Sequence, residues 1–202
     1  MFRERLRLSI GQIGQALREP EAFALRWHCE GAPYDWSVFA ALALTAIVGT
    51  TTYGMTMGML GDRSVANMFL CGLYCTAAAG IAWSLPLPAL YILNSLAGSR
   101  LRASTTFLAA LVTTSWGGLA MIAAIPLNWF FTVALPFPAV ALVVNLAIFT
   151  AVGVAMTDVF CRVMETLEPS RGRLPAWWLL LIGAIGGELF YAFGLFDFFS
   201  RA

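Results

Sequence analysis

One carboxylate lies in a stretch of sequence where a charge is costly. Glu188 follows a glycine-rich run near the middle of a long apolar segment. A charge at the centre of a membrane helix costs roughly 2.5–3.5 kcal/mol, so such a residue is by default a functional hypothesis. Asn145, Ser115 and a threonine of 50–52 are expected at similar depth. Together these residues would form a polar layer in the middle of the membrane. Such a layer could be a proton- or substrate-linked site. We favour the alternative, that it supplies hydrogen bonds that pack the helices together.

The other reactive residue types form no pattern typical of catalysis. His28 is the only histidine, and the four cysteines form no CxxC pair. Cys71 and Cys75 lie one helical turn apart in an apolar segment, which is more typical of small buried residues than of a redox or metal pair. The sequence has no phosphate-binding glycine loop, HExxH or GxSxG motif. We therefore expect no enzyme activity, no catalytic residue, no metal site and no cofactor.

Composition indicates which solvent surrounds the helices that carry these residues. Of the 202 residues, 60% are hydrophobic and only 11% are charged, whereas soluble domains have about 25% charged residues. A soluble globule of this size could not bury so much apolar surface, so the lipid bilayer is the predicted partner. The net charge of +1 does not favour nucleic-acid binding.

Five apolar segments reach the length of about 20 residues that a membrane span needs. They predict an all-α, polytopic transmembrane helix bundle of about five spans. Residues 1–35 are expected to be a cytoplasmic amphipathic segment, 36–199 the five-helix transmembrane domain and 200–202 a short tail. The expected spans are Ser37–Leu60, Asn67–Ala97, Ser104–Ile125, Pro136–Asp158 and Ala176–Phe199.

The second of these segments is too long for a straight span. Its 31 residues would exceed a bilayer core of about 30 Å at about 1.5 Å per residue. Pro86 and Pro88 lie within it, and each removes a helical hydrogen bond. The helix is therefore either kinked and tilted, or Leu87–Ala97 is a separate interfacial or re-entrant piece.

Basic residues predict the orientation of the chain. All twelve are arginines, and ten of them fall on one side if the N-terminus is cytoplasmic, against Arg63 and Arg201 on the other. This bias follows the positive-inside rule, which suits a bacterial inner membrane as well as several organelles. The lack of a visible secretory signal and the arginine-rich composition favour the bacterial inner membrane. Cys161–Pro175 is then expected to be a solvated cytoplasmic loop. Leu127–Leu135, which has no charge, is expected to be an aromatic loop at the outer interface.

The N-terminal segment has the spacing of an amphipathic helix. Its apolar residues step by three or four positions, and Arg3 and Arg7 fall largely off that face. A basic amphipathic helix beside a transmembrane domain most simply lies on the membrane surface, and packing on a partner or on the domain's own inner loops is the alternative. The predicted membrane-surface contacts are Phe2, Arg3, Leu6, Arg7, Ile10, Ile13 and Leu17.

Short motifs in the same layout give a family resemblance. Pro20–Phe23 precedes the first span, and Gly98–Arg100 leads into the Ser/Thr-Phe start of the third span at Ser104–Phe107. With five closely spaced spans, this chain resembles the Yip family of Rab-interacting membrane proteins, especially its small bacterial members. It departs from them at Thr114–Gly118, where a proline often follows the serine. The resemblance implies a non-enzymatic protein that organises membrane or scaffolds a partner, without implying Rab binding.

Two functions follow as expectations. The first is a structural or accessory subunit of a membrane assembly, which associates with other membrane-protein subunits or with itself. It fits the small mass outside the membrane and the lack of catalytic groups. The second is a small transporter or channel with a mid-membrane site at Glu188.

Overall fold

The structure, a computed structural model, describes residues 11–30, 34, 36–59, 64–96, 98–135, 137–171 and 177–194. These residues contain helices and no strand, so the all-α prediction is confirmed for them. Residues 11–18 form a helix that precedes the labelled ones. The labelled elements are α2 (Pro20–Glu30), α3 (Trp36–Met57), α4 (Val65–Ser84), α5 (Pro86–Leu96), α6 (Ala103–Trp129), the π-helix η1 (Phe130–Ala134), α7 (Pro138–Leu167), the 3-10 helix η2 (Pro169–Arg171) and α8 (Trp177–Ala192).

Four stretches of helix are long and apolar enough to cross a membrane. They are Trp36–Met57, Val65–Ile92, Ala103–Ala134 and Pro138–Leu167. The sixteen residues of α8 are apolar but fall short of the length of about 20 residues that a span needs.

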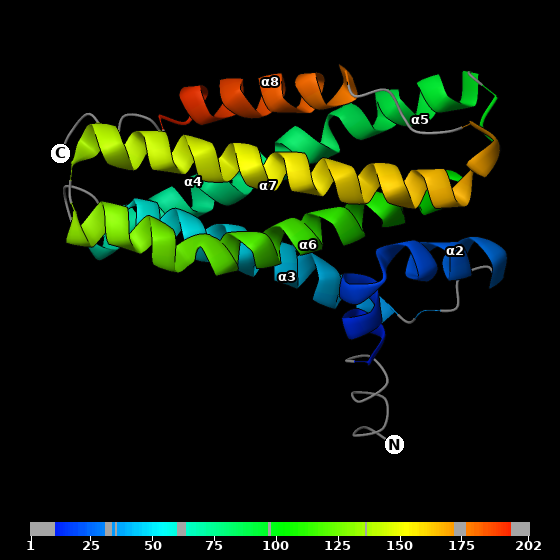
Figure 1. The fold of residues 1–202 in the computed structure, drawn as a ribbon, viewed down its shortest axis with the longest axis horizontal. Coiled ribbons are helices and arrows are strands. Elements are labelled where there is room, and N and C mark those ends of the chain that lie inside the picture. Colours follow the sequence, from blue (N-terminus) through cyan, green and yellow to red (C-terminus); the bar gives the residue numbers. More distant parts are fainter. Residues whose placement is uncertain are drawn as a thin grey trace.

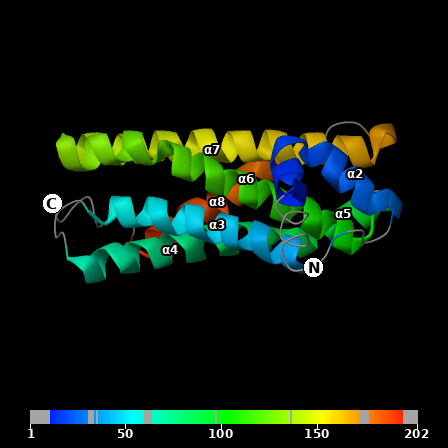
Figure 2. The same cartoon turned by 90° about the horizontal axis from the view of Figure 1, so that it is seen from below.

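The long helices lie side by side in an elongated bundle (Figure 1). α3 packs between α4 and α6, α7 packs on α6, and α8 lies along α4. A view turned by 90° shows α2 beside the ends of α6 and α7, at the same end of the bundle as α5 (Figure 2). We call this the α2 end. The turn between α6 and α7 lies at the opposite end (Figure 1).

Glycines let α3 approach its neighbours closely. A Cβ on Gly49 would overlap the carbonyl oxygen of Gly118 on α6, and a Cβ on Gly118 would lie 2.7 Å from the carbonyl oxygen of Thr45. On the other side of α3, a Cβ on Gly54 would lie 2.9 Å from the Cα of Gly72 on α4. These contacts are backbone to backbone, as is typical of helix pairs in membranes.

The helix of the second predicted span is kinked at a proline. Leu85, between α4 and α5, keeps right-handed helical angles (φ −68°, ψ −41°), and its N–H donates to the carbonyl oxygen of Ile81. Pro86 has no N–H to continue the pattern, so the regular helix stops for one residue and then resumes. With this one-residue interruption, Val65–Ile92 qualifies as one candidate span by length and composition.

The prediction of a loop over Leu127–Leu135 is wrong, because these residues are helical as far as Ala134. α6 ends at Trp129, and the π-helix η1 carries the chain to Ala134. Pro126 lies inside α6 and removes one hydrogen bond shortly before the wider turn begins. Asn128 and Thr132 are buried in this part of the helix, so the segment packs inside the bundle and is not an exposed loop.

The prediction of a solvated loop from Cys161 is also wrong for residues 161–167, which are helical. α7 continues to Leu167. Val159, Phe160, Val163, Met164 and Leu167 follow a helical spacing and are buried against residues of α2, α5 and α6.

Contacts between neighbouring helices give the register of the bundle. Ser115 on α6 donates to the carbonyl oxygen of Leu42 on α3 at 2.7 Å. Two residues further along α6, a Cβ on Gly117 would contact the side chain of Met156 on α7. Leu42, Ser115 and the part of α7 just after Met156 therefore lie at about the same level of the bundle.

The charged residues of α7 begin at that level. Asp158 and Arg162 are about half exposed and pair with each other at 3.1 Å. The part of α7 before Asp158 has about 20 residues, enough to cross a bilayer core of about 30 Å. Charged groups avoid hydrocarbon, and Asp158 is the first charged residue of α7. We call the helices from this level to the α2 end the cap: α2, α5, residues 103–114 of α6 and 158–167 of α7.

Candidate functional site

Four buried polar side chains and the partly buried Thr56 form a hydrogen-bonded network in the bundle. The Tyr53 hydroxyl donates to Asn145 Oδ1 at 2.7 Å, and Asn145 Nδ2 donates to Asn128 Oδ1 at 3.1 Å. Asn128 Nδ2 donates to Thr56 Oγ1 at 2.7 Å, and Thr132 Oγ1 donates to Asn128 Oδ1 at 2.8 Å. The network therefore joins α3, α6, η1 and α7.

Most hydrogen-bonding groups of the network are paired within it or with the helix backbone. Asn145 uses its second Nδ2 hydrogen on the carbonyl oxygen of Ala141 at 2.8 Å, and its Oδ1 accepts from Tyr53. Thr56 Oγ1 accepts from Asn128 and donates to the carbonyl oxygen of Tyr53 at 2.6 Å. Its members are amides and hydroxyls, which carry no charge at neutral pH. Such a network fixes helices relative to one another and offers no group to take up a proton.

A second polar contact joins α3 and α4. Thr51 Oγ1 lies 2.7 Å and Thr50 Oγ1 lies 3.1 Å from Thr76 Oγ1. Thr76 Oγ1 also donates to the carbonyl oxygen of Gly72 at 2.9 Å. These threonines meet α4, and the network meets α6 and α7, so α3 is tied to neighbours on two sides.

Asn145, Ser115 and Glu188 were predicted to form one polar layer, and the structure places them apart. Asn145 lies at the level of Tyr53, whereas Ser115 donates to the carbonyl oxygens of Leu42 and Leu111. Leu42 and Tyr53 are 11 residues apart on α3, or about 16 Å along the helix. Asn145 and Ser115 are both buried, but they serve different contacts.

Glu188 is exposed on α8 and lies outside the polar network. Its neighbours Leu189 and Phe190 turn inward and pack against the apolar core. Gly183 and Gly187 have open space where a Cβ would lie. The carboxyl group therefore faces away from the rest of the chain.

Aromatic stacking holds α2 against Tyr34, which lies between α2 and α3. The rings of Phe23 and Tyr34 stack at 4.0 Å between centroids, and the Tyr34 hydroxyl donates to the carbonyl oxygen of Phe23 at 3.0 Å. Both side chains are buried. Burial raises the pKa of the Tyr34 hydroxyl, and the nearby Arg26 opposes part of this increase.

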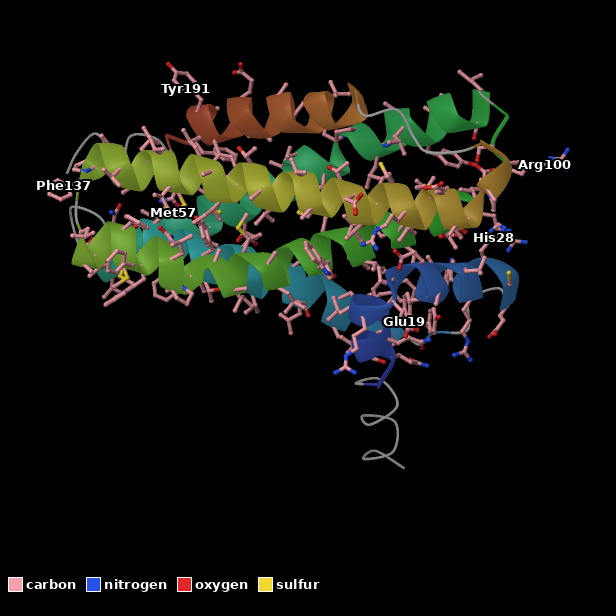
Figure 3. The ribbon with its side chains drawn as sticks, in the orientation of Figure 1. Glu19, His28, Met57, Arg100, Phe137 and Tyr191 are labelled. Carbon is pink, nitrogen blue, oxygen red and sulfur yellow. The ribbon has the colours of Figure 1, made fainter. Side chains whose placement is uncertain are left out.

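An ion pair and apolar packing connect α2 to α7. Glu21 Oε1 lies 3.1 Å from Arg162 Nη1, and Arg162 Nε lies 3.1 Å from Asp158. Ala24 is completely buried in the cluster formed by the ends of α6 and α7. In the stick view, Glu19, His28 and Arg100 mark the polar α2 end, and Met57 and Phe137 mark the opposite end (Figure 3).

The predicted membrane-surface residues divide into two groups. Ile13 and Leu17 are partly buried against a core that includes Phe23 and Val38, so these two side chains pack on the domain itself. This contact corresponds to the alternative of packing on the domain's own residues. The other predicted contacts lie outside the described residues: Phe2, Arg3, Leu6, Arg7 and Ile10.

Sequence reasoning missed a carboxylate that links the α5–α6 connection to the end of α7. Glu168 accepts from Ser99 Oγ at 2.8 Å and from the backbone N–H of Arg100 at 3.0 Å. Gly98 precedes them with a φ of +91°, a value that glycine adopts without strain. The Gly98–Arg100 motif pointed to this turn, but its partner lies almost 70 residues away in sequence.

The described residues contain no cluster of three or more His, Cys, Asp or Glu side chains that could hold a metal ion. Comparisons with protein-family models, curated proteins and solved structures found no match to this chain.

Proposed function

We propose that this chain is a non-enzymatic integral membrane protein that acts as a structural or accessory subunit of a membrane assembly, or as a membrane-organising protein. The closed polar network carries the proposal. Tyr53, Asn128 and Asn145 satisfy one another inside the bundle, where a transport pathway would need groups open to a substrate. The resemblance to small bacterial Yip proteins supports the same function.

We further propose five spans with a cytoplasmic N-terminus in a bacterial inner membrane, with α8 and the residues after it as the fifth span. The support is the arginine distribution and the packing of α8 along α4. The α2 end of the bundle then faces the cytoplasm, where α2 and the helix over 11–18 stand at the membrane surface.

Purification of the protein with its native partners tests the function. The full chain, extracted in nanodiscs, is expected to carry a companion membrane protein or further copies of itself at a fixed ratio in native mass spectrometry. A lone monomer that conducts ions or a solute in proteoliposomes would contradict the proposal. Glu188→Gln, with Thr150→Val as the matched lipid-facing control, would then show whether that flux depends on the carboxyl group.

Single cysteines test the topology in intact cells. Leu96 at the α2 end and Phe137 at the opposite end are both well exposed. In a Cys29→Ser background, an impermeant maleimide is expected to label Phe137→Cys from outside and Leu96→Cys only after permeabilisation. Ser200→Cys is expected to label from outside if α8 completes a fifth span. Labelling of Ser200→Cys only after permeabilisation would reduce the count to four spans.

A further inference from the structure

The outward face of α8 carries two polar side chains among small residues. Ala184, Gly187, Glu188 and Tyr191 are all exposed, and their spacing places them on one face of the helix. Tyr191 is 75% exposed and points away from the bundle (Figure 3). Among the residues that the structure describes, none outside α8 comes within 4 Å of a Cβ placed on Gly187. The face thus combines a carboxyl group, a phenol and room for a close neighbour.

Contacts on the inner face of α8 place this helix beside the candidate spans. Gly186 lies against Ala82 of α4, with 3.7 Å between an added Cβ and the Ala82 Cβ. The ring of Phe190 meets Phe149 of α7 at 4.6 Å between centroids. Glu188 lies between these two contact levels, on the side of α8 turned away from α4 and α7.

A lipid tail offers no hydrogen bond to either polar group. A carboxyl group exposed at this depth is expensive even when it is neutral, and so is an unpaired hydroxyl. The candidate spans contain no basic residue at this level that could neutralise Glu188. A neighbouring helix that supplies a hydroxyl donor would remove both costs.

We propose that α8 pairs with α8 of a second copy of this chain, with Glu188 of each copy accepting a hydrogen bond from Tyr191 of the other. The proposal depends on α8 being a membrane span, as proposed above. Side chains on a helix lean toward its N-terminus, so the Tyr191 phenol reaches back toward the level of Glu188. Two copies in one membrane run parallel, and a two-fold axis makes the two hydrogen bonds equivalent. One face therefore supplies both the donor and the acceptor.

The glycines allow the approach that these bonds require. Gly183 and Gly187 lie one turn apart, and nothing else in the chain contacts the positions where their side chains would lie. Small residues at this spacing let helix backbones come close in membranes. A partner helix with a basic residue would also satisfy Glu188, but it would leave Tyr191 without a matched acceptor.

Disulfide cross-linking in native membranes tests the pairing. In a Cys29→Ser background, Ala184→Cys is expected to form a disulfide-linked dimer on mild oxidation, because the two Cα atoms would come within about 7 Å. Val154→Cys, on the exposed face of α7, is the matched control and is expected to cross-link at least fivefold less. Equal cross-linking at both positions would overturn the proposal, and so would cross-linking of Ala184→Cys to a different protein.

Two further substitutions test the hydrogen bonds themselves. Tyr191→Phe keeps the ring and removes the donor, and Glu188→Leu removes the acceptor. Each is expected to lower the cross-linked fraction of Ala184→Cys several-fold, and the double variant is expected to be no worse than the poorer single variant. An unchanged fraction in both single variants would refute the pairing. The labelling of Ser200→Cys separately reports whether α8 spans the membrane, so the two proposals can fail independently.

Discussion

The membrane part of the bundle and the cap are held together by different interactions. In the membrane part, α3 meets α6 at backbone contacts between Gly49 and Gly118, reinforced by the polar network around Asn145. In the cap, aromatic and aliphatic side chains such as Phe23 are buried, with an ion pair at the edge. Apolar burial is driven by water where water surrounds a fold, whereas helices surrounded by lipid associate through close packing and hydrogen bonds.

The largest effect should come from the glycine contact in the membrane part. Gly49→Ala places a Cβ on the backbone of Gly118, which cannot move aside as a flexible side chain could. We expect a loss of about 3 kcal/mol or more, or failure to fold. Gly80→Ala, where the added Cβ meets nothing within 4 Å, is the matched control. Thermal unfolding in detergent measures both, and equal melting temperatures would show that the contact is not tight.

In the cap, a substitution should cost a comparable free energy but unfold only α2, while the long helices stay packed. Phe23→Ala removes a fully buried ring that stacks on Tyr34. The cost of about 3 kcal/mol should loosen α2 from the helices it packs on, because Phe23 is the largest side chain that α2 buries. Hydrogen exchange should therefore rise in α2 and remain unchanged in α3. Leu25→Ala, on the exposed side of α2, is the control. Exchange that rises equally in α3 would mean that the two parts unfold together.

The polar network should contribute somewhat less. Asn145→Leu removes the bonds to Tyr53 and Asn128 and leaves both partners buried. We expect a loss of about 2 kcal/mol, with a weaker contact between α3 and α7. Thr150→Val on the exposed side of α7 should change little, because Thr150 donates only to the carbonyl oxygen of Leu146 in its own helix. Equal stability of the two variants would show that the network adds nothing.

The carboxylate at the end of α7 should have a smaller, local effect. Glu168→Gln replaces a charged acceptor of the Ser99 and Arg100 hydrogen bonds with a neutral one. We expect a cost of about 1 kcal/mol and faster hydrogen exchange at Arg100 and Leu101. Glu165→Gln, which is exposed one turn earlier, is the control. Unchanged exchange in Glu168→Gln would show that the turn is stable without the charge.

The smallest effect is a pH dependence confined to the cap. Burial raises the pKa of Tyr34, so the folded cap favours the neutral hydroxyl. This contribution is fully present below the ordinary pKa of about 10 and is lost as the pH rises through the raised value. Exchange in α2 should therefore increase above pH 10 once the intrinsic rate is corrected for, and Tyr34→Phe should remove the increase. An identical rise in Tyr34→Phe would assign it to another group.

The sequence predicted the class of fold and most of the helices, because long apolar segments are a strong local signal. It placed the end of α7 too early, because the charged residue Asp158 indicated the end of the helix, whereas α7 continues to Leu167. The spacing of Val159, Val163 and Leu167 carries the signal that α7 continues.

The polar network was only partly predictable. Asn145 stood out as a polar residue in an apolar segment, but its partner Tyr53 is 92 residues away in sequence. Asn128 and Thr132 are four residues apart, which would have indicated a shared helix face had the segment not been taken for a loop. The level of Ser115 relative to Asn145 depends on how far each helix extends beyond the bilayer core, and hydropathy alone does not contain that information.

The ion pair between α2 and α7 can form only late in synthesis, because α7 is made long after α2. Glu21 leaves the ribosome 141 residues before Arg162, a delay of roughly 7–28 s at about 5–20 residues per second. During that interval Phe23 meets α3 and α6 first, while Ala24 still lacks α7, which later helps to bury it. The nascent N-terminal helix must therefore be shielded by the membrane surface or by a chaperone until α7 arrives. A chain truncated before α7 should expose α2 to proteases and to quality control.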